Sequence, residues 1–183
     1  MDNQILSHVN KMSLTTHSCI PALNFQLLSI FLFLILFFKA NAQNQLKLKL
    51  QGKGDKHFIY QYFNKNPHEV FVNGQFKGNW IKACYFDNED NDITVNFNEP
   101  IYNCDHMFLE IVDITEIDFT NLDLSHINSM ISMFNGCINL KKIIFGNLDT
   151  SLVTNMYRLF FNCKELTSLD LSKFDTRSVI TMQ

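Results

Sequence analysis

Hydrophobic and polar positions recur with a 26-residue period through the C-terminal half of the chain. The half divides into ITEIDFTNLDLSHINSMISMFNGCIN from residue 114, LKKIIFGNLDTSLVTNMYRLFFNCKE from residue 140 and LTSLDLSKFDTRSVITMQ from residue 166. Asp123, Asp149 and Asp175 occupy one shared position of this period. A fixed period of this length is typical of stacked structural units. The coinciding apolar positions include Ile114/Leu140/Leu166, Ile117/Ile143/Leu169, Phe119/Phe145/Leu171 and Leu122/Leu148/Phe174.

Each block changes its hydrophobic period halfway. In the middle block the apolar positions 140, 143, 145 and 148 have the L-x-x-L-x-L shape of a short strand whose alternate residues point inward. The apolar positions 153, 156, 159, 160 and 163 are spaced by three and four, which favours a helix or a 3₁₀ turn. Asp149-Thr150-Ser151 supplies side-chain oxygens suited to turning the chain and capping that helix. The pattern therefore predicts an α/β repeat solenoid with a parallel sheet on one face.

The blocks resemble the 26-residue BspA-type leucine-rich repeat of bacterial and protist surface proteins. The resemblance covers about residues 101–183 and rests on LTSLDLSKFDTRSVITM and MYRLFFNCKELTSLDLS, which follow the family pattern L-x-x-L-D-L-S-x-F-D-T-S-x-V-x-x-M-x-x-M-F-x-x-C. It implies a leucine-rich-repeat-like solenoid in a secreted or surface-displayed protein that adheres to host or matrix proteins. The expected units are 101–113, 114–139, 140–165 and 166–183.

The last of these units contains only the first 18 positions of the period. It lacks the M-F-x-x-C segment that would cover its apolar side chains. We therefore expect the solenoid to be truncated at its C-terminal end and to leave those side chains uncovered.

Residues 43–100 lie outside the period and are expected to form an all-β N-terminal cap. The segments LKLKLQG, EVFVNGQF and ITVNFNEP predict strands, and Asn73-Gly74 predicts a tight turn. Similar leaders appear in protist members of the family that the blocks resemble. The cap is expected to cover the open edge of the first unit.

Residues 1–42 are interpreted as a secretory signal peptide. The twelve residues 27–38 contain one polar residue, and Ala40-Asn41-Ala42 follows them as a small-x-small cleavage site. This run is shorter than the roughly 20 residues that span a bilayer. The expected location is secreted or on the cell surface. The alternative is a signal anchor, in which residues 25–39 hold the protein in the membrane.

Charge and motifs exclude several kinds of function. The net charge is −3 and no basic stripe is present, so nucleic acid is not an expected partner. No catalytic, phosphate-binding or C-x-x-C motif occurs, so we expect no enzymatic activity, no metal and no cofactor. Cys137 and Cys163 share one apolar position and are expected to be buried thiols. Cys84 and Cys104 are a possible disulfide.

The outward side of the predicted strands is the best candidate for a functional surface. Solenoids of this kind bind proteins on the concave strand face. We therefore expect a non-enzymatic binding or adhesion module with a protein partner. The alternatives are a structural surface spacer and the ectodomain fragment of a larger membrane receptor. The candidate residues are Glu116, Asp118, Thr120, Lys142, Ile144, Ser168, Asp170 and Ser172.

Overall fold

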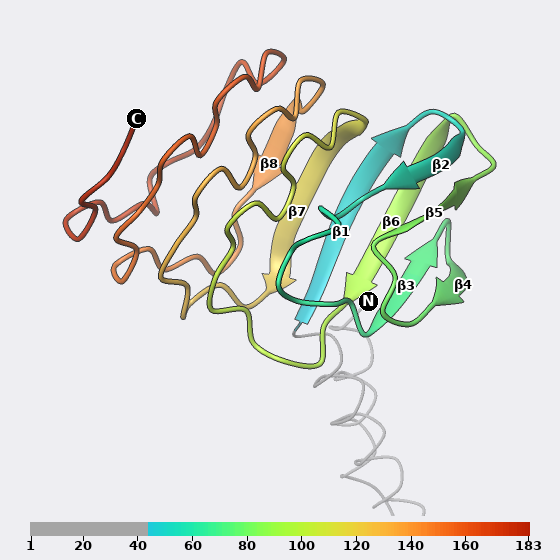
Figure 1. The fold of residues 1–183 in the computed structure, drawn as a ribbon, viewed down its shortest axis with the longest axis horizontal. Helices are drawn as coiled ribbons and strands as arrows, with labels where there is room; N and C mark the ends of the chain where they lie inside the picture. The colour runs from blue at the N-terminus through green and yellow to red at the C-terminus, as the bar shows by residue number, and fades with distance from the viewer. Residues whose placement is uncertain (1–43) are drawn as a thin grey trace, which may run out of the picture. The chain divides into compact units, whose positions relative to one another are not determined.

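The computed structural model describes residues 44–183, which contain eight strands in two sheets (Figure 1). The larger sheet has six strands in the order β4-β3-β6-β1-β7-β8, and the smaller sheet pairs β2 with β5. The strands are β1 (Asn44–Gln51), β2 (Gly54–His57), β3 (Glu69–Val72), β4 (Gln75–Gly78), β5 (Ala83–Phe86), β6 (Asp90–Asn96), β7 (Ile114–Leu122) and β8 (Lys142–Ile144).

The N-terminal strands form where the alternation of apolar and polar residues predicts them. β1 buries Leu46, Leu48 and Leu50 and exposes the residues between them, so one face of the strand lines the core. β3 and β4 form a hairpin in which Asn73 and Gly74 have φ angles of 51° and 76°. Two successive positive φ angles define the tight turn that suits the twist of a hairpin. The predicted strands and turn of this region are confirmed.

Strand β1 joins this N-terminal region to the 26-residue units. It pairs antiparallel with β6 on one side and antiparallel with β7 on the other. β7 then pairs in parallel with β8, which belongs to the next unit. The N-terminal strands and the first two unit strands therefore share one mixed sheet. The described residues belong to a single compact unit, in which β1 covers the edge of β7.

The second half of each unit consists of turns. Residues 44–183 contain no helix. Alternate amides of this half donate to carbonyl oxygens of the following unit, as in Ser132 N to Tyr157 O (2.8 Å) and Phe134 N to Leu159 O (3.0 Å). Such bonds leave those amides unavailable for the N–H to C=O bonding of a helix. The same pattern joins the preceding unit to this one through Cys104, His106, Phe108 and Glu110.

Left-handed backbone conformations explain why the predicted helix is wrong. His106, Ser132 and Arg158, which share one position of the period, have φ angles of 62°, 51° and 54°. Gly136 and Asn162 have φ angles of 79° and 61°. A residue with positive φ interrupts a right-handed helix, so the chain proceeds as successive turns. Apolar spacings of three and four arise from these turns as they would from a helix.

The predicted fold class therefore needs correction. The described part of the chain is all-β, with mixed sheets and no closure into a solenoid, rather than an α/β repeat solenoid of the leucine-rich type. Only β7 and β8 pair as parallel unit strands, and residues 166–183 contribute no strand of their own. The sheet continues instead into the antiparallel N-terminal strands.

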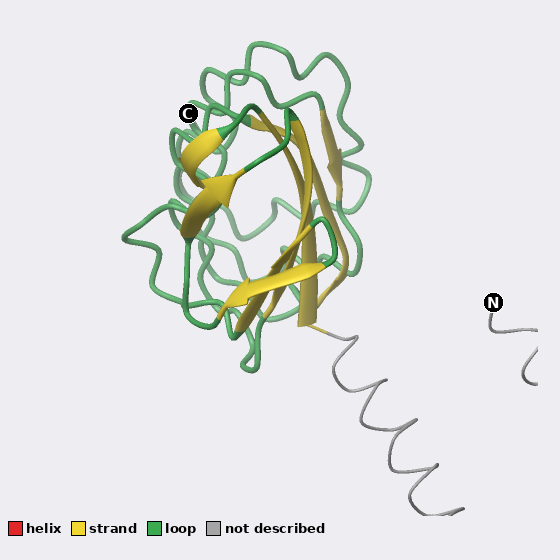
Figure 2. Ribbon diagram, turned by 90° about the vertical axis from the view of Figure 1, so that its right-hand side faces the viewer, coloured by secondary structure: helices red, strands yellow, loops and turns green. Residues whose placement is uncertain are grey.

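The core lies between the larger sheet and the turn-containing segments, and Figure 2 shows the sheet edge-on with most of these segments on one side. Phenylalanines from successive units stack within it. The rings of Phe134 and Phe160 are parallel with centroids 5.4 Å apart, and those of Phe119 and Phe145 are parallel at 5.9 Å. The ring of Phe134 also meets that of Phe119 edge-on at 6.2 Å. The aromatic side chains thus link neighbouring units to one another and to β7.

The cysteines at the shared position add a hydrogen bond between units. The Cys137 thiol donates to the carbonyl oxygen of Phe108 and the Cys163 thiol to that of Phe134, both at 3.0 Å. Burial raises the pKa of the Cys163 thiol to about 11 and raises that of Cys137 further. Both are free thiols, and Cys137 is buried as predicted whereas Cys163 is only partly buried.

The shared aspartate turns the chain in each unit. The Oδ1 atoms of Asp123, Asp149 and Asp175 accept the backbone N–H two residues on, at 2.9, 2.9 and 3.0 Å. This is the turning role predicted from their position, although no helix follows. These bonds favour the charged carboxylate. The pKa of all three groups is lowered, and hydrogen bonds from Arg177 lower that of Asp175 to about 2.

The lowered pKa values predict a loss of stability in acid. A carboxylate whose pKa is lower in the folded chain stabilises the fold above the unfolded value of about 3.9, and this stabilisation disappears as the pH falls through the folded value. We expect the melting temperature to fall between pH 4 and pH 2. The triple variant Asp123→Asn, Asp149→Asn, Asp175→Asn keeps an oxygen acceptor but cannot titrate there. Its melting temperature, followed by circular dichroism, should fall less over this range, and an equal fall would contradict the assignment.

Apolar side chains are less buried in the last unit than in the units before it. Leu171 and Met182 are 46% and 61% exposed. Phe119 and Met130, which hold the same positions in an earlier unit, are fully buried. Each earlier unit is covered by the unit stacked on it, and unit 166–183 has no such neighbour among the described residues. A hollow of about 530 Å³ opens at this end between Met156, Phe160, Phe161, Phe174 and Met182.

Candidate functional site

The side of the larger sheet that faces away from the core carries the candidate site. Successive residues of a strand point to opposite faces, so the residues between the buried ones project outward together. On β7 these are Glu116 and Asp118, and on β8 they are Lys142 and Ile144. The sheet brings these four predicted residues to one surface. We name as the outer face the residues Lys47, Lys49, Asp92, Thr94, Glu116, Asp118, Lys142 and Ile144, which line a hollow of about 330 Å³.

Charges of opposite sign alternate across this face. Strand register places Lys49 of β1 between Asp92 of β6 and Glu116 of β7, and Glu116 opposite Lys142 of β8. The row therefore runs negative, positive, negative, positive over four neighbouring strands. Lys49 Nζ lies 3.3 Å from Glu116 Oε2, and both side chains are about half exposed. Opposite charges on directly paired strand residues stabilise the sheet by roughly 0.2–1 kcal/mol each.

A second row lies beside the first on the same face. Lys47 of β1 is opposite Thr94 of β6 and Asp118 of β7, and Asp118 is opposite Ile144 of β8. Asp118 Oδ1 also accepts the backbone N–H of Thr120 at 2.8 Å. This carboxylate is thereby held in place. The row continues beyond Thr94 to the aromatic side chains of β3 and β4.

Two aromatic side chains extend the second row at one end. Phe71 of β3 is opposite Thr94, and the Phe71 and Phe76 rings meet edge-on with centroids 5.6 Å apart. Phe76 is 56% exposed and Ile144 at the other end is 37% exposed. The outer face thus has a charged centre between apolar ends. Protein interfaces usually have an apolar core and a polar rim, so charges at the centre of this face would contribute selectivity rather than apolar burial.

The remaining predicted residues lie apart from this arrangement. Thr120 is exposed on β7 beyond Asp118. Ser168, Asp170 and Ser172 are exposed in a segment without strand structure, where Asp170 Oδ1 accepts the Ser172 N–H at 2.9 Å. Hydrogen bonding from the side chain of Ser172, and then from its backbone N–H, lowers the pKa of Asp170. These four residues do not line the hollow.

The sequence analysis missed half of the outer face. Lys47, Lys49, Asp92 and Thr94 come from β1 and β6, which were assigned to a separate cap. The alternation in LKLKL and DITV does place these residues on one side of their strands. These residues join those of the units because β1 pairs with β7. Neither strand contains a sequence pattern that predicts this pairing.

The candidate disulfide is not formed in the structure. Cys84 of β5 is half-buried and Cys104 is buried, and both are free thiols. Burial raises the pKa of each, with the nearby charge of Lys77 opposing the rise at Cys84. Neither thiol is therefore activated as a nucleophile.

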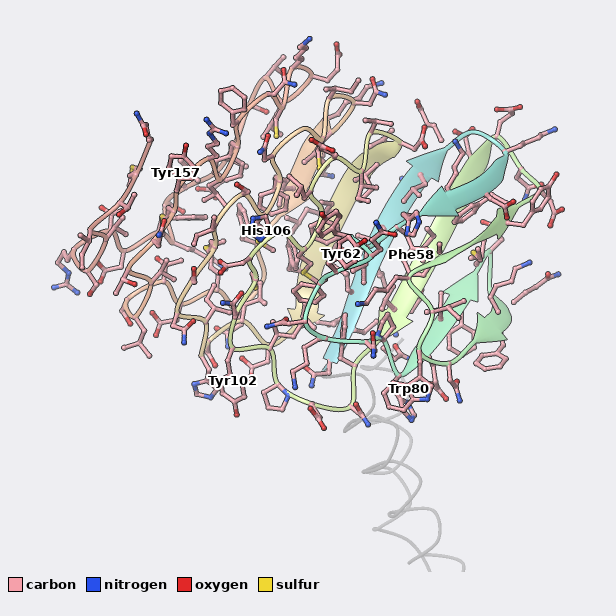
Figure 3. All side chains as sticks on the ribbon, viewed as in Figure 1. Phe58, Tyr62, Trp80, Tyr102, His106 and Tyr157 are labelled. Atoms are coloured by element: carbon pink, nitrogen blue, oxygen red, sulfur yellow. The ribbon has the colours of Figure 1, made fainter. Side chains whose placement is uncertain are left out.

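Several aromatic side chains lie close together outside the outer face. The ring centroid of Tyr60 lies 5.6 Å from that of Tyr62 and 6.5 Å from that of His106. Tyr62 and His106 are labelled in Figure 3. Within residues 44–183 no group of three or more His, Cys, Asp or Glu side chains is placed to hold a metal ion. The same residues include no helix that is both long and apolar enough to span a bilayer. The predicted signal peptide at 1–42 and the apolar segment 25–39 lie outside this part of the chain.

Comparison with known proteins adds one similarity. Residues 102–183 match a family described as "Mycoplasma protein of unknown function, DUF285". This match contains the 26-residue units and leaves out β1 to β6, which supply half of the outer face. No curated protein matches the chain, and no solved structure matches it.

Proposed function

We propose that this protein is a non-enzymatic binding module that contacts a protein partner through the outer face. The observation that carries the proposal is the arrangement of that face, in which charges of both signs alternate between exposed apolar ends. The hydrogen-bonded strands hold the charges at fixed spacings. Complementary charge patterns of this kind select partners more than they raise affinity.

We further propose that the protein is exported and acts outside the cell or on its surface. The apolar run 27–38 followed by Ala40-Asn41-Ala42 supports export. The resemblance of the units to those of BspA-type surface proteins supports an adhesive role. If residues 25–39 are retained, the same face is presented by a membrane-anchored protein.

Charge reversal on the outer face tests the binding role. Full-length tagged chains carrying Asp118→Lys or Lys142→Glu are expressed in cells that produce the protein, cross-linked and purified, and captured proteins are quantified by mass spectrometry. A partner captured by the unchanged chain should fall by about tenfold, because like charges brought together at an interface cost several kcal/mol. N-terminal sequencing of the exported chain should begin at Gln43.

Glu165→Lys provides the matched control, because it makes the same change of charge as Asp118→Lys at an exposed residue outside the outer face. Capture should be unaffected by this substitution. Equal capture by all variants would contradict the proposal and favour a structural spacer. Intact residues 25–39 on membrane-embedded protein would establish the anchor.

A further inference from the structure

The signs of the charges on the outer face reverse on either side of a line between β1 and β7. The four strands β6, β1, β7 and β8 carry negative, positive, negative and positive charges in the row of Lys49. Read in the opposite direction, the row has every sign reversed. The row of Lys47 behaves in the same way at its centre, because Lys47 and Asp118 are neighbours on β1 and β7.

We propose that the outer face binds a second copy of this chain about a two-fold axis that runs parallel to the strands between β1 and β7. Rotation about this axis places β1 of one copy over β7 of the other, and β6 over β8. Each charged residue then meets a residue of opposite charge. A two-fold contact is isologous, so every pair forms twice. The facing pairs are Asp92 with Lys142, Lys49 with Glu116, and Lys47 with Asp118.

The other two-fold axis available within the plane of the face is excluded by the same charges. An axis perpendicular to the strands and passing along a row would lay each strand over its own copy. Lys49 would then face Lys49, and Glu116 would face Glu116. Like charges directly opposed at an interface cost several kcal/mol. The alternation therefore favours an axis parallel to the strands over one perpendicular to them.

The lateral pairs within one copy leave the charges available for this contact. The side chains of Lys49 and Glu116 are 55% and 40% exposed although they form an ion pair with each other. Each therefore keeps a side that is open to a facing group. An exposed ion pair is a weak interaction. A second residue of opposite charge, facing each of these side chains from the other copy, would therefore add to the lateral pair without breaking a strong contact.

The size of the face suits a weak dimer. The four strands that face one another, spaced about 4.8 Å apart and on average about 20 Å long, present roughly 400 Å² per copy. Two copies would bury roughly 800 Å², which is below the standard size of specific interfaces and suits a weak, transient contact. Association in the micromolar range or weaker is therefore expected. The proposal rests on the binding role of the outer face and names the partner as the chain itself.

Co-purification of two differently tagged full-length copies tests the inference. Unchanged copies that are expressed together and cross-linked before purification should co-purify, because cross-linking retains a weak complex. When both copies carry Lys49→Glu, or both carry Glu116→Lys, recovery of the second tag should fall about tenfold, because each substitution opposes two like charges. A Lys49→Glu copy expressed with a Glu116→Lys copy should recover the association, since the introduced glutamate then faces the introduced lysine and the two unchanged residues face each other. Recovery also shows that each substituted chain folds.

Three results would overturn the inference: unchanged copies that do not co-purify, single substitutions that leave recovery unchanged, or a mixed pair that recovers no better than the matched ones. The second result would show that any association uses another surface, such as the apolar hollow near Met182. Failure here is distinguishable from failure of the binding role. A different captured protein that is lost with Asp118→Lys would uphold that role even when the copies remain apart.

Discussion

Replacing Phe134 with alanine is expected to lower the free energy of unfolding by about 3–5 kcal/mol. Phe134 is fully buried and its ring lies between those of Phe108 and Phe160, at centroid distances of 5.8 and 5.4 Å. It also meets Phe119 and Phe145 edge-on. The substitution would leave a cavity where two aromatic stacks meet. Because domains are typically stable by about 5–15 kcal/mol, this is a large fraction of the total.

Urea unfolding followed by fluorescence or circular dichroism measures this loss. Phe161→Ala is the matched control, because Phe161 lies in the following unit beside Phe160 and is 57% exposed. It should change the free energy of unfolding by less than about 1 kcal/mol. Similar losses for the two variants would mean that the aromatic stacks do not hold the units together.

Gly146→Ala is expected to destabilise the fold by about 3 kcal/mol. A Cβ atom at Gly146 would lie 2.5 Å from the Cα atom of Thr120 and 2.6 Å from the carbonyl oxygen of Phe119. Both contacts are with backbone, which cannot rotate away as a side chain could. The chain after β8 would have to move away from β7.

The register of the two unit strands explains why they approach so closely here. Glu116 pairs with Lys142, its equivalent in the next unit, whereas Leu124 bridges to Leu148, which is the equivalent of Leu122. Unit 114–139 therefore has two more residues than unit 140–165 between these paired positions, near Thr120. Asn147→Ala, at the exposed neighbouring position, is the control and should leave the unfolding midpoint nearly unchanged. A stable Gly146→Ala protein would show that this approach is not required.

Sequence patterns predicted the strands and the turn-forming aspartates because each of these depends on neighbouring residues. The alternation around Leu48 specifies a strand with one buried face. An aspartate that accepts an N–H two residues on, such as Asp123, needs no distant partner. The 26-residue period likewise located the core, since Phe134 and Met130 are fully buried at positions that the period marks as apolar.

The predicted helices failed because spacing does not distinguish a helix from consecutive turns. Of the positions with left-handed backbone, Gly136 and Asn162 carry residues that favour this conformation. The residue types at His106, Ser132 and Arg158 predict a left-handed backbone less clearly. Hydrogen bonding to the next unit stabilises that conformation at all three, and such a bond is a tertiary feature.

The outer face was half predicted for a similar reason. Glu116 and Lys142 belong to units whose periodicity aligns them, so their shared face could be inferred. Lys49 reaches the same face only because β1 pairs with β7, which lies far along the chain. The opposite charges of Lys49 and Glu116 agree with this pairing, but many other lysine and glutamate pairs in the chain would agree with a different one.

The two different pairings of β7 restrict how a chain of this kind can change length during evolution. One edge of β7 is bound antiparallel to β1 and the other is bound in parallel to β8. A further 26-residue unit duplicated after β7 could insert in parallel and pass the same hydrogen-bonding pattern to its neighbour. A duplication placed before β7 would have to separate it from β1 and divide the charged surface that the two strands share. We therefore expect added units to be tolerated on one side only, where they would leave the surface made by β6, β1 and β7 unchanged.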